Sequence, residues 1–148
     1  MELGDISSKL KTLSIETGSV FKATMLRSDG VVPKHSGETS RDKYFVVLGK
    51  DVDSYLVGVL LINSGINNNL AKIIAPYQHC IYPDEYDFLD GQYRYVNCYD
   101  IKRISFKKIS EEAEYIGFIN DADMQEIIRL AKESPGNRHD ILEQFNII

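Results

Sequence analysis

The chain has 148 residues, of which 43% are hydrophobic and 26% are charged, as is typical of one globular domain with an apolar core. We therefore expect a single domain over residues 1–148. No apolar run approaches the ~20 residues that a membrane-spanning helix needs. The first residues, MELGDISSKLKTLS, lack the apolar segment of a secretory signal. These features predict a cytoplasmic protein that does not enter a membrane.

The net charge of −5 is distributed unevenly along the chain. Residues 1–50 carry eight Lys/Arg and six Asp/Glu, whereas residues 51–148 carry nine and sixteen. Because nucleic-acid binding rests on contacts between Lys/Arg and phosphates, the acidic total argues against a protein that coats nucleic acid broadly. A local basic cleft is compatible with it, since residues 22–50 include six basic and three acidic side chains.

The metal-binding residue types show no site pattern. Cys80 and Cys98 lie in apolar, β-rich stretches, which predicts two buried thiols in a reducing compartment. The two cysteines and three histidines lack zinc-ligand spacing. The acidic residues of Asp84–Asp90 lack the regular spacing and glycine of a calcium loop. We therefore expect neither a metal ion nor another cofactor.

The first third of the chain predicts one helix, one strand and a loop. Residues 5–14 place apolar side chains at helical spacing, which favours a short amphipathic helix. A strand is expected at Val20–Leu26. The non-periodic, polar residues Arg27–Asp42 predict a long loop, and loops of this length in compact domains are often functional.

The stretch Lys43–Ser64 is the apolar centre of the sequence. Its two runs, Tyr44–Leu48 and Tyr55–Ile62, are rich in Val, Leu, Ile and aromatics and do not alternate cleanly with polar residues. Such a pattern is typical of strands that are covered on both faces or closed into a small barrel. Turn-forming residues 49–54 separate the runs, so we predict an antiparallel hairpin whose two ends meet at one rim.

The second half of the chain predicts more strands and then a helix. The expected elements, in order, are a strand at Ala71–Ala75, an irregular segment at Tyr77–Asp90, β structure at Tyr93–Cys98 and Ile101–Phe106, a helix capped by Asp121 and ending at Ser134–Gly136, and helical turns at His139–Phe145. This order predicts a mainly β (α+β) fold. It would be a small, bent antiparallel barrel with a C-terminal helix and a short N-terminal helix.

Three pieces of the sequence form an ordered pattern: Gly18–Phe21; Lys43–Leu48; and Tyr95–Ile104 followed by Ile116–Met124. In this order they resemble the MazF/PemK family of toxin–antitoxin endoribonucleases. The first is similar to the family's first strand, and the second to a basic residue followed by the second strand. The third is similar to a late strand, an (I/V)-G-x-L element and the opening of a helix. The resemblance implies an SH3-like barrel with a C-terminal helix.

The resemblance also implies a function and a site. In that family a catalytic Arg, usually followed by Pro, precedes the second strand, and a Ser or Thr ends the next one. Here Lys43-Tyr44 occupies the first place, with Arg41 two residues earlier, and Asn63 and Ser64 occupy the second. The implied protein is a metal-independent endoribonuclease toxin that cleaves single-stranded RNA, forms a homodimer and is neutralised by an antitoxin protein.

The residue types suit this chemistry. Metal-free RNA cleavage needs a base for the 2′-OH proton, an acid for the 5′-oxygen and a cation or donor for the phosphorane. Arg41 or Lys43 would stabilise the phosphorane, although only an Arg binds two phosphate oxygens at once. Ser64 or Asn63 would donate from the facing strand end, and His35 in the loop would act as acid or base.

Structural interpretations of the same residues stay open. The cations and His35 are also typical of solvated loop residues, and Asn63-Ser64 is typical of a turn. The missing Arg-Pro pair and the net charge of −5 favour an alternative, a catalytically inactive SH3-like barrel that binds a protein or a nucleic acid. A third interpretation is a small-molecule-binding regulator with Tyr77–Tyr93 as a lid.

Overall fold

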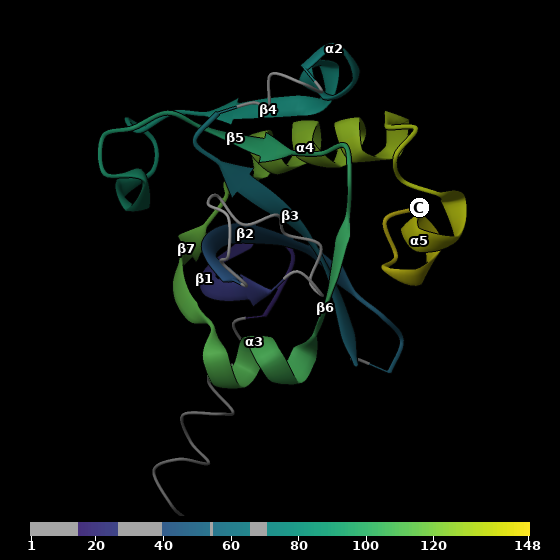
Figure 1. Ribbon diagram of the computed structural model, residues 1–148. Coiled ribbons are helices and arrows are strands. Elements are labelled where there is room, and N and C mark those ends of the chain that lie inside the picture. Colours follow the sequence, from purple (N-terminus) through teal and green to yellow (C-terminus); the bar gives the residue numbers. More distant parts are fainter. Residues whose placement is uncertain (1–14, 27–39, 54, 66–70) are drawn as a thin grey trace, which may run out of the picture.

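The structure, a computed structural model, describes residues 15–26, 40–53, 55–65 and 71–148. Figure 1 shows the arrangement of its helices and strands. The elements are β1 (Ser19–Leu26), β2 (Ser40–Lys50), β3 (Leu56–Asn63), α2 (Ala71–Ile74), η2 (Ala75–Tyr77), β4 (Gln78–Ile81), η3 (Asp87–Leu89), β5 (Arg94–Asn97), β6 (Lys102–Ser105), α3 (Phe106–Glu112), β7 (Glu114–Phe118), α4 (Asp121–Glu133) and α5 (His139–Gln144).

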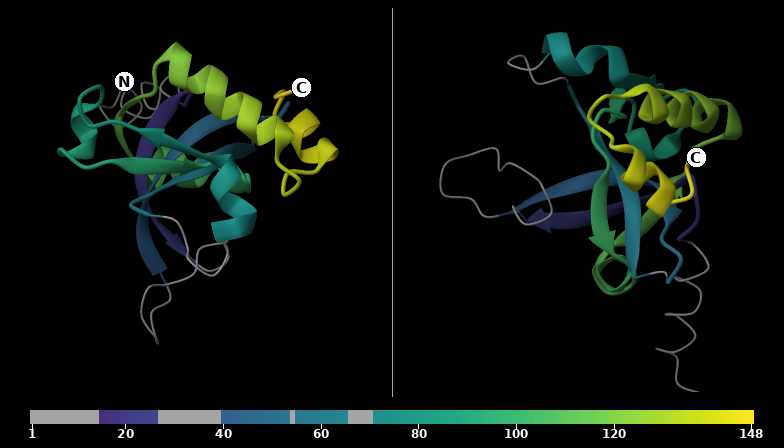
Figure 2. Two further views of the ribbon diagram at one scale, coloured as in Figure 1. Left: turned by 90° about the horizontal axis from the view of Figure 1, so that it is seen from above. Right: turned by 90° about the vertical axis from the view of Figure 1, so that its right-hand side faces the viewer.

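The strands form one antiparallel sheet in the order β4-β5-β3-β2-β1-β7, with β6 pairing β3. The predicted hairpin is present as β2–β3, in which Tyr44 pairs with Ile62 and Val46 with Leu60. The mainly β, α+β class is therefore confirmed. The sheet bends strongly (Figures 1 and 2), but it is not closed: within the described residues, β4 and β7 form its two edges.

The central strands are apolar on both sides because each side faces its own core. Successive side chains of a strand point to opposite faces. The first face carries Val20, Val46, Leu60 and Ile62 and belongs to a core that α4 and the C-terminal residues complete. The second face carries Phe21, Phe45, Val47 and Leu61 and belongs to a core that includes Ile109 of α3. Figure 1 shows α3 on the side of the sheet away from α4 and α5.

Phe145 closes the first face over the hairpin. It is 1% exposed, and its backbone and ring lie directly against Gly49 and Gly58. A Cβ on Gly49 would lie 2.2 Å from the Phe145 carbonyl oxygen, and one on Gly58 would lie 2.8 Å from the ring. The missing side chains of these glycines therefore let the end of the chain pack on β2 and β3.

Helix α4 follows from its sequence. Met124, Ile127 and Ala131 are buried at helical spacing. Its N-cap is Asn120, whose side chain accepts a hydrogen bond from the Asp123 backbone N–H at 2.8 Å, so the expectation of an Asp121 cap was wrong by one residue. Asp121 lies instead in the first turn, where the helix dipole favours a carboxylate.

Other boundaries differ from expectation. Residues 71–75 are helical in α2 and η2 rather than a strand, because the short apolar run is compatible with either state and Pro76 suits the first turn of η2. The segment expected to be irregular contains β4. Helix α3 was not expected; its signal is the Ser105 cap, which accepts from the Lys108 N–H at 3.1 Å. The expected loop ends earlier, since β2 begins at Ser40, and the predicted helix over residues 5–14 lies outside the described residues.

Both thiols are unpaired, Cys98 buried and Cys80 half-buried. In the described part of the chain, no helix is long and apolar enough to cross a membrane. In the same residues, no group of three or more His, Cys, Asp or Glu side chains is placed to hold a metal ion.

Candidate functional site

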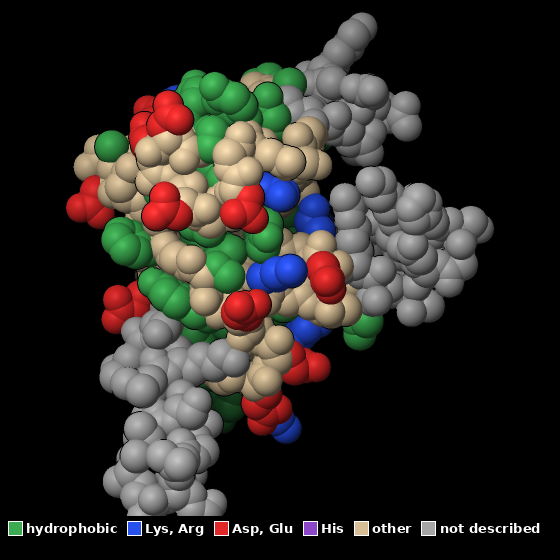
Figure 3. Space-filling model, turned by 90° about the vertical axis from the view of Figure 1, so that its left-hand side faces the viewer, with side chains coloured by type: hydrophobic (Ala, Val, Ile, Leu, Met, Phe, Trp, Pro, Cys, Tyr) green, Lys and Arg blue, Asp and Glu red, His purple; other side chains and the backbone are tan. Residues whose placement is uncertain are grey.

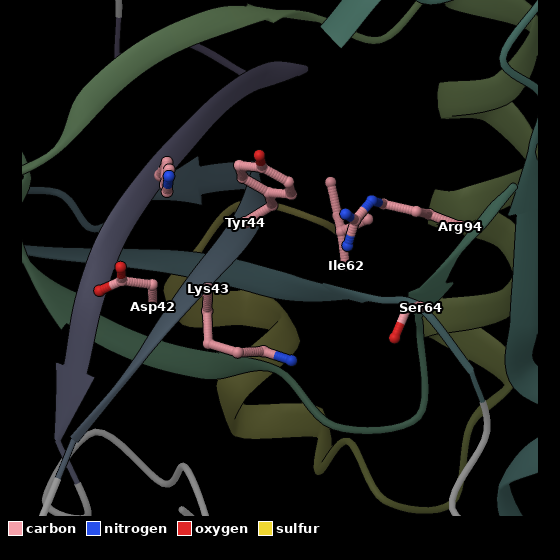
Figure 4. Close-up of a pocket in the computed structure, with 7 residues that line it drawn as sticks. Asp42, Lys43, Tyr44, Ile62, Ser64 and Arg94 are labelled. Carbon is pink, nitrogen blue, oxygen red and sulfur yellow. The ribbon is translucent and has the colours of Figure 1, made fainter. Parts of the chain in front are cut away.

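The hairpin ends and β5 share one rim of the sheet. Ile62 of β3 pairs with Tyr44 on one side and with Val96 on the other, so the first residues of β2 and β5 flank the last residues of β3. A pocket of about 190 Å³ opens at this rim. Its lining residues are Lys22, Asp42, Lys43, Tyr44, Ile62, Ser64 and Arg94 (Figure 4).

Lys43 lies on the second face of the sheet and is only 8% exposed. It pairs with Ala23 across β1, and its Nζ donates a hydrogen bond to Oδ1 of Asn63. Figure 4 shows its side chain leaving β2 on the side opposite to Tyr44. The two hairpin ends that the sequence places at one rim are therefore in direct contact, through Lys43 and Asn63.

The other predicted site residues are placed less closely. Ser64 is exposed and lines the pocket just beyond the end of β3. Arg41 lies in β2 and pairs with Met25 of β1, so it belongs to a strand rather than to the expected loop. His35 lies outside the described residues. The structure thus brings together Lys43, Asn63 and Ser64 of the predicted set.

Sequence reasoning missed the first-face half of the rim. The Arg94 guanidinium carbon lies 4.8 Å from the centre of the Tyr44 ring, and Lys22 Nζ lies 5.8 Å from the same centre. Both distances are within the range of cation–π attraction. Figure 4 shows Arg94 extending from β5 towards Tyr44. Arg94 falls within the β structure predicted at Tyr93–Cys98, and its approach to Tyr44 depends on β5 pairing with β3.

The rim is locally basic in an acidic protein. Three cations and one carboxylate, Asp42, line the pocket. Asp42 accepts a hydrogen bond from the Thr24 hydroxyl at 2.7 Å, which ties it to β1. In the space-filling view, Lys and Arg side chains lie close together near the middle of the face shown, beside Asp and Glu (Figure 3). This combination of donors, cations and one acceptor suits a phosphate-containing ligand.

A second polar cluster joins β4 to α4. His79 Nε2 lies 2.8 Å from Asp123 Oδ1, and the Tyr86 hydroxyl donates to Asp123 Oδ2 at 2.5 Å. Burial, and then the hydrogen bond to Asp123, raises the pKa of Tyr86 above its ordinary value. A hydroxyl held in its protonated form suits a fixed donor, so we assign this cluster to holding the edge strand on the helix.

Comparisons with known proteins support the fold. No family model matches the sequence, and no curated protein matches it significantly. Among solved structures, a chain in the crystal structure of MazE–MazF (Form-III) from Deinococcus radiodurans is similar, with a TM-score of 0.56 and 12% sequence identity. The similarity covers 84% of this chain and 99% of that chain. The protein therefore has a MazF-like fold.

Proposed function

We propose that this protein is the toxin of a type II toxin–antitoxin pair and acts as a metal-independent endoribonuclease on single-stranded RNA. The observation that carries the proposal is the basic rim. On a MazF-like fold, Lys22, Lys43 and Arg94 line one pocket at the rim that the hairpin ends share, in a protein whose net charge is −5. Basic side chains concentrated at one site of an acidic protein favour a specific anionic ligand over broad coating.

The rim supplies groups for the chemistry. In the proposed reaction the 2′-oxygen attacks the adjacent phosphorus, its proton passes to a base, and the bond from phosphorus to the 5′-oxygen breaks as that oxygen is protonated. Lys43 and the Asn63 amide would stabilise the charge that develops on the phosphorane. Ser64 would donate from the strand end, and Asp42 is the pocket carboxylate that would accept the 2′-OH proton.

Arg41 and His35 remain proposals on the same footing. Arg41 lies two residues before Lys43 on β2. It would add a second cation beside the phosphorane. His35 would supply the acid or base.

Partners are proposed from the same similarity. The solved structure contains MazE together with MazF, so we propose an antitoxin protein as the partner of this chain. A homodimer, which the sequence resemblance implies, is the assembly that we propose. Co-expression with the product of a neighbouring short reading frame tests the first. We expect this product to restore growth and to co-purify with the toxin.

Cleavage by the purified protein is the direct test. Single-stranded RNA incubated in EDTA should be cut to products with a 5′-hydroxyl, and expression in a bacterial host should arrest growth and degrade RNA. A protein carrying both Arg41→Ala and Lys43→Ala should do neither. Intact RNA and unimpaired growth with the unmodified protein would overturn the proposal.

One observation favours a second candidate, a non-catalytic barrel that binds RNA or a protein. Lys43 stands where the resemblance expects an Arg, is buried, and is hydrogen-bonded to Asn63. A buried Lys cannot present the planar fork by which an Arg holds two phosphate oxygens. RNA binding without cleavage in the same assay is the result that this candidate predicts.

A further inference from the structure

Lys43 and Arg94, two cations at the rim, are held in different ways. Lys43 is hydrogen-bonded to Asn63, whereas Arg94 lies over the Tyr44 ring. We propose that Arg94, braced by Tyr44, is the residue that binds a backbone phosphate of single-stranded RNA, whereas Lys43 is held within the protein. The identity of the ligand as RNA rests on the proposed function; the assignment of Arg94 rests on the geometry of the pocket.

The side chain of Lys43 is engaged by the protein itself. It is 8% exposed and donates to Asn63 on the second face of the sheet. To contact a phosphate in the pocket directly, the Lys43 ammonium would have to break its hydrogen bond to Asn63. Lys43 therefore suits a fixed positive charge beside the reaction better than a first contact for the RNA backbone.

The side chain of Arg94 is braced but not neutralised. Its guanidinium lies 4.8 Å from the Tyr44 ring centre, and its Nε is buried without a hydrogen-bond partner among the described residues. Arg129 differs, because its guanidinium is bound by the carboxylates of Glu126 and Glu133. An Arg that rests on a ring keeps its terminal Nη donors for a ligand, and a phosphate accepts two hydrogen bonds from them at once.

The surroundings of Arg94 favour RNA over an acidic peptide. Lys22 lies against the same ring, so a phosphate bound by Arg94 would meet a second cation. The next residue towards the N-terminus, Tyr93, is 57% exposed and contacts Tyr82, 49% exposed, with ring centres 5.4 Å apart. Exposed aromatic rings at the start of β5 offer a surface on which unpaired bases stack.

The test measures binding without cleavage. The probe is a short, mixed-sequence, fluorescein-labelled 2′-O-methyl oligoribonucleotide, which cannot be cleaved because it has no free 2′-OH. Fluorescence anisotropy over a range of salt concentrations gives Kd and its salt dependence for the unmodified protein and for Arg94→Ala, Arg94→Lys and Arg103→Ala. Arg103 is the matched control, since it is exposed and pairs with Gly58, towards the opposite end of β3.

Arg94→Ala should weaken binding on the order of tenfold and make the slope of log K against log salt shallower by about 0.7, the contribution of one phosphate contact on a single strand. Arg94→Lys should keep the slope and weaken binding a few-fold, because it retains the charge and loses the fork. Arg103→Ala should leave the salt slope unchanged and should change Kd only slightly, through the loss of one distant positive charge. Circular dichroism and thermal melting check that each variant is folded, and Arg94→Lys serves as the test if Arg94→Ala does not fold.

The outcomes separate this inference from the proposed function. Equal Kd and slope for Arg94→Ala and Arg103→Ala, or a failure of the unmodified protein to bind, would overturn the role of Arg94. If binding depends on Arg94 but natural RNA is not cleaved, the phosphate site would be supported and the proposed ribonuclease activity would be contradicted. Poly-glutamate and unlabelled RNA should be compared as competitors at equal charge concentration. If poly-glutamate displaces the probe as effectively as RNA does, the preference for a nucleic acid would be contradicted.

Discussion

Each face of the sheet carries a cation at the same rim, but the two cations are held in different ways. On the second face, Lys43 is buried and its ammonium is hydrogen-bonded to Asn63. On the first face, the Arg94 guanidinium rests on the Tyr44 ring, and its Nε has no hydrogen-bond partner in the described residues. Lys43 and Tyr44 are consecutive in the chain, yet alternation along β2 sends them to different sides.

Two cations at one strand end can therefore serve different purposes, one stabilising charge and the other binding a ligand. A cation held by an amide is fixed in position, and it suits stabilising charge at one point. A cation stacked on a ring is oriented while its outer donors remain available, and it suits binding a ligand. If the two faces differ in this way, changes on each face should have separable effects on stability, turnover and RNA binding.

The largest expected effect is on the first face as a whole. Phe145, 1% exposed, closes this face against Gly49 and Gly58, so Phe145→Ala should lower the free energy of unfolding by about 3–5 kcal/mol. Urea denaturation gives the value. The matched control is Phe118→Ala, which removes a ring that is 65% exposed and should change stability by about 0.5 kcal/mol or less. Equal losses for both variants would show that Phe145 does not close the core.

Kinetics should separate the two cations. Given the proposed reaction, Lys43→Ala should lower kcat on the order of 10²-fold or more with little change in KM, because the ammonium stabilises charge in the transition state. Arg94→Ala should mainly raise KM, by about tenfold, because it holds the backbone. Initial rates on a single-stranded RNA measure both, with the exposed Lys107→Ala as the control. The reverse pattern would exchange the roles of the two faces.

Alkaline pH should weaken the first-face core through its thiol. Burial raises the pKa of Cys98 from 9.0 to about 12. Since the unfolded chain releases this proton first, the stabilisation is complete below pH 9 and is lost as pH rises towards 12. The loss is at most about 1.4 kcal/mol per pH unit. Cys98→Ala should make the decline in unfolding free energy shallower over this range and leave its pH dependence below pH 8 unchanged; parallel curves throughout would contradict the assignment.

The smallest expected effect concerns the brace under Arg94. Tyr44→Leu should weaken binding of the 2′-O-methyl oligonucleotide two- to five-fold, because a partly exposed cation–π contact contributes about 0.5–1 kcal/mol. Tyr44→Phe keeps the ring and should bind like the unmodified protein. Anisotropy with the same probe measures both variants. Loss of affinity in Tyr44→Phe would point to the hydroxyl rather than the ring as the functional group.

Local signals predicted much of the fold. The β2–β3 hairpin and α4 came from apolar runs, turn residues and helical periodicity, which depend on near neighbours in the chain. The errors fall where those signals are weak. Residues 71–75 form too short an apolar run to distinguish strand from helix, and α3 buries only Ile109, so it has no apolar period to detect.

The site shows the same division. Asn63 was predicted to lie near Lys43 because a hairpin brings its own ends together, and the two are in contact. His35 lies outside the described residues. Arg94 was missed because β5 reaches the rim only by pairing with β3 from more than thirty residues along the chain, and no local pattern encodes that pairing.

An apolar hairpin at the centre of a β core, with its two ends at one rim, follows from the sequence, because turn chemistry and apolar content are local properties. The side chains that meet at that rim follow from the tertiary structure. The pairing of β5 with β3 brought Arg94 over Tyr44, and the alternation of β2 put Lys43 on the opposite face beside Asn63. Side-chain partners across strands depend on sheet order and register, which a one-dimensional pattern does not specify.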